Sequence, residues 1–116
     1  MINLGDVYSD LGEYPRALSY YEQSLEISRE IGDKQREGNN LTNIGIVYCD
    51  FGDYPKALSY HEQALKIKRE IRDKNGECDN LINIGNVYNH LADYQKALSY
   101  YEKALNINRI LCKTSS

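Results

Sequence analysis

Apolar residues recur along the chain at intervals of three and four, the spacing of one face of an α-helix. From Ala57 to Ile71 they form a stripe that only His61 and Lys68 interrupt with polar side chains, which predicts a long amphipathic helix. A similar pattern predicts a helix from about Lys34 to Phe51. A shorter stripe over residues 1–11 predicts a helix that lacks its opening turns. Either the natural protein starts abruptly or this chain is a piece of a longer array, and we favour the second interpretation.

The pattern repeats with a fixed period. Of the 40 positions from Gly5 to Ile44, 25 are identical in Gly45 to Ile84. A period of roughly 20–50 residues is typical of stacked repeat arrays, in which neighbouring units share one continuous core. We therefore predict an all-α solenoid, a superhelix of about three helical hairpins that forms a single array over residues 1–116. Its units span about residues 1–32, 33–72 and 73–112, with a tail at 113–116 and a truncated first unit.

The predicted hairpin turns contain residues that typically end one helix and start the next. Residues 12–15 and 52–55 combine a Gly that ends one helix, an acidic residue that caps the next, and a Pro in its first turn. Residues 92–95 keep only the acidic cap, so we expect that turn to be less sharply fixed. A Gly recurs inside the first helix of each unit, at a cost of about 1 kcal/mol relative to Ala. This predicts a close approach of the partner helix at the matching Ala17, Ala57 and Ala97.

The repeated residues resemble the tetratricopeptide repeat. Unit two carries the family's pattern of a large apolar residue, an apolar-Gly pair and a Tyr, followed by Gly, Tyr, Ala, an aromatic slot filled by His, and Ala-Leu. Arg replaces the closing Pro of the common repeat, which lets each second helix continue. The resulting 40-residue form is similar to the repeats of kinesin light chain and of spindle-orientation adaptors. The unit two positions are Leu41, Ile44, Gly45, Tyr48, Gly52, Tyr54, Ala57, His61, Ala64 and Leu65.

The resemblance implies that the first helices line a concave surface. One face of these helices, set by helical spacing, supplies the candidate peptide-binding residues. Its Asn side chains are interpreted as a ladder that holds peptide backbone, with solvated or structural amides as the alternative. Its acids favour a partner carrying Lys or Arg, although they would equally keep an exposed face soluble. The residues are Asn3, Asp6, Asp10, Asn39, Asn43, Ile46, Asp50, Asp79, Asn83, Asn86, Asn89 and His90.

Composition and charge argue against several classes of function. A formal charge of −3 argues against nucleic-acid binding by phosphate neutralisation, and no apolar run is long enough for a membrane span. Three cysteines without a C-x-x-C pair favour reduced thiols and a cytoplasmic location. His90 has no companion at metal-ligand spacing, and a Cys49–His90 pair is a weak basis for catalysis. We expect no enzyme activity and no cofactor, and assign His61 to the core.

The function predicted is a protein-interaction scaffold that binds a partner peptide in the groove. Two alternatives stay open. Apolar residues in the last predicted helix, without a polar capping helix after it, would meet missing repeats or let copies stack end to end as a homo-oligomer, because arrays need polar terminal helices for solubility. The chain would otherwise serve as the regulatory binding arm of a larger signalling protein. A basic cluster near the end of the unit two second helix, which includes Lys68, is interpreted as complementing the helix dipole.

Overall fold

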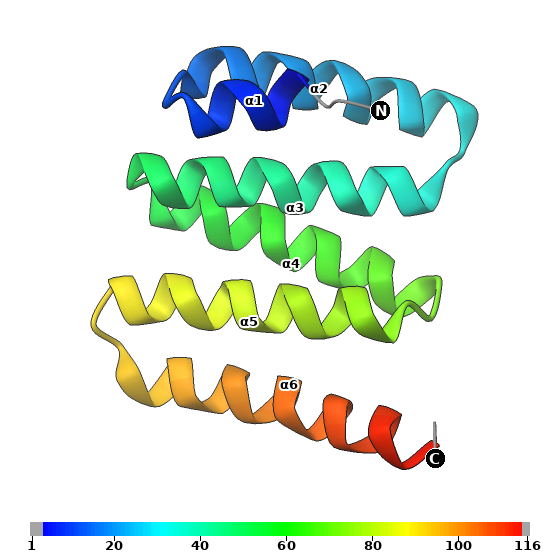
Figure 1. Cartoon of the computed structure of the whole chain (residues 1–116), viewed down its shortest axis with the longest axis vertical. Coiled ribbons are helices and arrows are strands. Elements are labelled where there is room, and N and C mark those ends of the chain that lie inside the picture. Colours follow the sequence, from blue (N-terminus) through cyan, green and yellow to red (C-terminus); the bar gives the residue numbers. More distant parts are fainter. Residues whose placement is uncertain (1–3, 115–116) are drawn as a thin grey trace.

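The computed structural model describes residues 4–114, with side chains described as far as Ile110, and Asn3 lies outside this range. Residues 4–114 form six α-helices and no strand, and consecutive helices pack as antiparallel hairpins (Figure 1). The fold is an all-α solenoid of three hairpins, as the period predicts. The helices are α1 (Leu4–Asp10), α2 (Tyr14–Ile31), α3 (Lys34–Phe51), α4 (Tyr54–Glu70), α5 (Lys74–His90) and α6 (Tyr94–Thr114).

The stacking order follows the chain. Within each hairpin α1 contacts α2, α3 contacts α4 and α5 contacts α6, while α2 against α3 and α4 against α5 join one unit to the next. The first helices α3 and α5 also contact each other directly. In Figure 1 the hairpins follow one another from α1 and α2 at the top to α6 at the bottom. The predicted limits of α3 are confirmed, and α6 runs two residues past the expected unit end at 112.

Acidic caps start most of the helices, as predicted. The carboxylates of Asp33 and Asp73 accept backbone N–H bonds of 3.1 and 2.9 Å, from Arg36 and Gly76 respectively. Glu13 is the exception, because its side chain makes no cap hydrogen bond. Its extra methylene makes it a poorer N-cap than Asp, so the predicted cap at this position is wrong.

The third hairpin turn keeps the geometry of the first two. Ala92 adopts a left-handed backbone with φ of 61°, where the matching Gly52 has φ of 95°. Its N–H donates to the Asn89 carbonyl over 3.0 Å, as that of Gly52 does to Cys49. The loss of Gly and Pro therefore leaves the geometry of the turn unchanged, and how firmly the turn is fixed stays a prediction. Ala92 thus adopts a conformation that costs a residue with a Cβ about 1 kcal/mol.

A ring, and not an alanine, faces the glycine inside each first helix. A Cβ built on Gly45 would lie 2.6 Å from Cε1 of His61, and on Gly85 it would lie 2.6 Å from Cε1 of Tyr101. The predicted close approach at Ala57 is corrected to His61, although Ala57 is itself fully buried. His61 is 1% exposed, which agrees with its assignment to the core. The glycine is needed because the flat ring packs directly on the helix backbone.

Each hairpin is also held by a stacked pair of tyrosines from its two helices. The ring centroids lie 5.5–5.6 Å apart, the planes are within 14° of parallel, and a cation lies over the ring of each first-helix tyrosine. The same arrangement in all three units indicates a structural role, because aromatic stacking and cation–π contacts both add to packing. The sets are Tyr8, Tyr20 and Arg16; Tyr48, Tyr60 and Lys56; and Tyr88, Tyr100 and Lys96.

Candidate functional site

The predicted site residues gather on one face of α1, α3 and α5, which we call the first-helix face. Three hollows open on it, and every predicted residue from Asp6 onward lines at least one of them. Asn3 lies outside the described residues. Helical spacing alone was enough to place these side chains on a common face, because residues at i, i+4, i+7 and i+11 project in one direction.

The first hollow lies between α1 and α3 and has a volume of about 390 Å³. The exposed carboxylates of Asp6, Asp10 and Asp50 line it, together with Asn43 and the ring of Tyr21. The Tyr21 hydroxyl donates a hydrogen bond to Asp6 Oδ1. Burial, followed by this contact with Asp6, raises the pKa of Tyr21, so the phenol stays neutral. This hollow therefore carries a concentration of negative charge.

The second hollow lies one repeat further along, between α3 and α5, with a volume of about 180 Å³. It repeats the first hollow in register, with His61 in the place of Tyr21 and Asn83 in the place of Asn43. Asp50 borders both hollows. Cys49 also lines this space, and burial followed by the neighbouring Asp50 raises the pKa of its thiol. The Cys49 thiol is thus kept protonated, which makes it a poor nucleophile.

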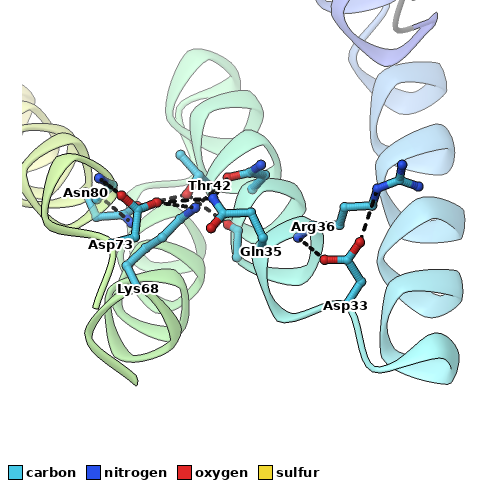
Figure 2. A network of polar contacts seen from close by, with 10 residues as sticks. Asp33, Gln35, Arg36, Thr42, Lys68, Asp73 and Asn80 are labelled. Carbon is cyan, nitrogen blue, oxygen red and sulfur yellow. Dashed lines mark hydrogen bonds and ion pairs between the residues drawn. The ribbon is translucent and has the colours of Figure 1, made fainter. Parts of the chain in front are cut away.

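The third hollow, of about 370 Å³, lies between the opening turns of α3 and α5 and contains an ionic network around one buried lysine. Lys68 reaches into it from α4 with a residue exposure of only 3%. Its Nζ donates to Asn39 Oδ1 over 2.5 Å and to Asp73 Oδ2 over 3.2 Å, and Gln35 Nε2 donates to Asp73 Oδ2 over 3.1 Å. Figure 2 shows Lys68, Asp73 and Gln35 pointing toward one another.

This network ties unit two to unit three. The Gly76 backbone N–H, followed by Gln35, holds the pKa of Asp73 below its usual range, so its carboxylate is charged opposite Lys68. A Cβ on Gly76 would lie 2.6 Å from Cδ of Lys68, so the glycine makes room for the lysine stem. Lys68 is accordingly a buried pairing residue. Its predicted place in the last turn of α4 is confirmed, and the structure adds its pairing with Asp73.

Hydrogen bonding divides the predicted Asn ladder into two groups. Asn39 accepts from Lys68, and Asn86 Oδ1 accepts from the Tyr101 hydroxyl over 2.5 Å, so both are engaged inside the protein. The half-buried amides of Asn43 and Asn83, in contrast, make no hydrogen bond to any side chain or backbone group of the described chain. These two amides occupy the same register in successive units. Their donors and acceptors are left for solvent or for a ligand.

Other predicted residues also have internal roles. The imidazole of His90 stacks on Tyr54 with centroids 5.7 Å apart and planes 10° from parallel, which gives one wall of the second hollow. Asp79 and Asn89 are exposed on the same face.

In residues 4–110 no group of three or more His, Cys, Asp or Glu side chains is placed to hold a metal ion.

Sequence reasoning missed the buried polar residues that join the units. Asn80, 1% exposed, accepts a hydrogen bond of 2.9 Å from Thr42 and so links α3 to α5. Asn40 donates over 3.0 Å to Ser24 of the preceding unit. The signal available was that Asn40 and Asn80 recur one period apart, next to the apolar stripe. Their spacing did not distinguish a core amide from a surface one.

Comparison with known proteins defines the class of this protein. The family model of the tetratricopeptide repeat matches residues 1–70 and 36–110. Together these matches cover nearly the whole chain, and the chain belongs to the tetratricopeptide repeat family. No curated protein matches the sequence. No helix within residues 4–114 is long and apolar enough to cross a membrane.

Solved structures agree with this assignment. The tetratricopeptide repeat domain of Arabidopsis FLU is 22% identical, with a TM-score of 0.83 over 91% of this chain and 89% of that one. BtubC (BKLC) from P. vanneervenii is 29% identical, with a TM-score of 0.86 over 94% of this chain and 45% of that one. The TPR2AB domain of yeast Sti1, solved in complex with pHSP90, is 26% identical, with a TM-score of 0.79 over 94% of this chain and 41% of that one. The chain spans less than half of the second and third of these structures.

Proposed function

We propose that this chain is a protein-interaction module that binds an extended segment of a partner protein along the first-helix face. The observation that carries the proposal is the pair of half-buried amides at Asn43 and Asn83, which have no partner among the described residues. An Asn side chain can both donate to and accept from a peptide backbone. Two such amides at one register, one repeat apart, suit a ligand that runs along the array.

The charge of the face favours a partner segment with basic side chains. Asp6, Asp10 and Asp50 border the first hollow, and Asp79 borders the third. The single lysine on these hollows, Lys68, is already paired with Asp73. Complementary charge of this kind steers association and fixes register more than it raises affinity. The Sti1 structure, solved with pHSP90, supports the general use of this fold for protein recognition.

The test is a peptide-display selection on the parent chain beside an Asn43→Ala, Asn83→Ala double variant. We expect a shared, basic motif on the parent that the folded double variant no longer enriches. A matched control is the Gln23→Ala, Gln63→Ala double variant, since these exposed amides on α2 and α4 bond only to Ser19 and Ser59 of their own helices. Equal enrichment on the Asn variant and the control would refute the role of the Asn amides.

A second candidate function is end-to-end assembly with another copy. Leu98 and Leu105 of α6 are 58% and 48% exposed, whereas the matching Leu58 and Leu65 of α4 are covered by the unit that follows. On the opposite end, Leu4 of α1 is 50% exposed where the matching Ile44 is fully buried. If α1 of one copy packed on α6 of another, both exposed apolar surfaces would be covered. Inside the chain, α4 and α5 cover each other in the same way.

Light scattering over a concentration series tests this second function. Assembly predicts a molar mass that rises with concentration in the parent and stays at the monomer in a Leu98→Ser, Leu105→Ser variant. The matched control is Ile27→Ser, which removes a similarly exposed apolar side chain from α2. A parent that stays monomeric at high concentration would exclude self-assembly.

A further inference from the structure

The second hollow differs from its repeat equivalent in the group at its floor. In the first hollow the Tyr21 hydroxyl is satisfied by Asp6, and in unit three the Tyr101 hydroxyl is satisfied by Asn86. His61 takes this place in unit two, and the residue that would face it, by repeat equivalence, is the apolar Ile46. The imidazole therefore lacks the internal partner that both tyrosines have.

His61 is the exception among buried polar side chains. Its Nδ1 is the one buried side-chain nitrogen or oxygen of the described residues without a hydrogen-bond partner. A buried polar group without a partner costs about 1–3 kcal/mol, and such a group calls for an explanation. The ring lines the second hollow, but Nδ1 has almost no exposed surface, so a ligand that used this nitrogen as an acceptor would have to displace the groups that cover it.

The chemistry around the hollow is that of hydrogen-bond acceptors and negative charge. Asp50 supplies a carboxylate and Asn83 supplies an amide oxygen without an internal partner. No Lys or Arg lines the hollow. Burial lowers the pKa of His61 to about 4, so at neutral pH its imidazole is uncharged and one of its nitrogens has a free lone pair. Ile46 adds an apolar wall.

We propose that the second hollow binds the ammonium group of a lysine side chain from the partner segment. This inference rests on the proposed function and assigns a side-chain specificity to one position of the face. An ammonium carries three donors and no acceptor, which matches the acceptors of Asp50, Asn83 and His61. The apolar stem of a lysine packs against surface such as Ile46 while its charged end is solvated by polar groups. The volume of about 180 Å³ admits one extended side chain of this size.

The test uses two small probes, N-acetyl-lysine N-methylamide and its norleucine counterpart, which lacks the ammonium. Each is titrated into the full chain and followed by NMR signals of the His61 ring and of the Asn83 side-chain amide. We expect the lysine probe to shift both signals and the norleucine probe at the same concentration to leave them in place. Asp50→Asn should weaken lysine binding by about threefold, the size of an exposed charge contact. His61→Phe removes one neutral hydrogen-bond acceptor and should weaken lysine binding by a similar factor.

Glu102→Gln is the matched control, because Glu102 is an exposed acid on α6 that borders none of the three hollows. It should leave the affinity for the lysine probe unchanged. The proposal is overturned if norleucine shifts the same signals equally, or if the lysine shifts are confined to the first hollow at Asp6 and Asp10. It is also overturned if His61→Phe, confirmed as folded by circular dichroism, binds the probe as tightly as the parent.

These results separate the two proposals. Lysine-probe binding without any display-selected peptide would leave the lysine subsite standing and remove the peptide-binding function. A display motif that depends on Asn43 and Asn83, without any response to the lysine probe, would support the function and overturn the subsite.

Discussion

Replacing His61 with Phe should remove a defined part of the pH dependence of stability. The imidazole is buried against the backbone of Gly45, and its desolvation lowers the pKa from 6.5 to about 4. Phe keeps an aromatic ring in this place, as Tyr21 and Tyr101 do in the other units. The variant therefore removes the titratable group while it preserves the shape of the core.

The sign follows from the depressed pKa of the folded state. Below about pH 6.5 the unfolded chain takes up a proton on His61 that the folded chain refuses, so the free energy of unfolding falls as the pH falls. The loss is complete near the folded pKa of about 4. One pKa unit corresponds to about 1.4 kcal/mol, so at about pH 5 the parent has lost about 2 kcal/mol through this group.

The assay is urea unfolding followed by circular dichroism, at about pH 7.5 and about pH 5, for the parent and His61→Phe. Carboxylates common to both proteins cancel in the double difference. The expected result is that the parent loses about 2 kcal/mol more than the variant between the two pH values. A second variant, His61→Tyr, guards against poor packing of Phe. Equal pH dependence in the parent and both variants would show that His61 is not held neutral by burial.

Three further substitutions test the packing and the turns, each by urea unfolding. Ala92→Gly should stabilise by about 1 kcal/mol, because it relieves the left-handed backbone, and a loss of stability would contradict that strain. Gly45→Ala should destabilise by about 1–3 kcal/mol through overpacking against the ring opposite, despite the better helix propensity of Ala; a gain in stability would mean that the ring can move. Asp73→Ala should lower the free energy of unfolding by about 3 kcal/mol more than Asp33→Ala does. Both substitutions remove a helix cap, but only Asp73→Ala leaves buried Lys68 without its carboxylate partner. Equal costs for the two cap variants would show that the ion pair contributes nothing.

Local signals account for what the sequence predicted well. The start of α3 and α5 follows from Asp33 and Asp73, whose short carboxylates cap the backbone next to them. The 40-residue period predicts the hairpin array, because each unit needs a neighbour to cover its apolar face. The backbone of the third turn could not be predicted from local propensity, because Ala92 adopts a left-handed conformation that is unfavourable for a residue with a Cβ.

The candidate site was predictable as a face but not as a set of contacts. Helical spacing places Asn39, Asn43, Asn83 and Asn86 on one side of α3 and α5. Which amides are engaged depends on side chains that arrive from the second helices. Lys68 reaches Asn39 because Gly76 leaves it room, and Tyr101 reaches Asn86 because Gly85 does the same. Such packing partners are distant in sequence, so the spacing alone could not separate the two free amides from the two bonded ones.

Calorimetric titration with a display-selected peptide measures directly whether Asn43 and Asn83 bind the partner segment. The parent, the Asn43→Ala, Asn83→Ala variant and the Gln23→Ala, Gln63→Ala control would be titrated under identical conditions. We expect the Asn variant to lose at least about tenfold in affinity, the equivalent of about 1.4 kcal/mol, and the control to keep the affinity of the parent. An Asn variant that is folded and binds as tightly as the parent would contradict this expectation.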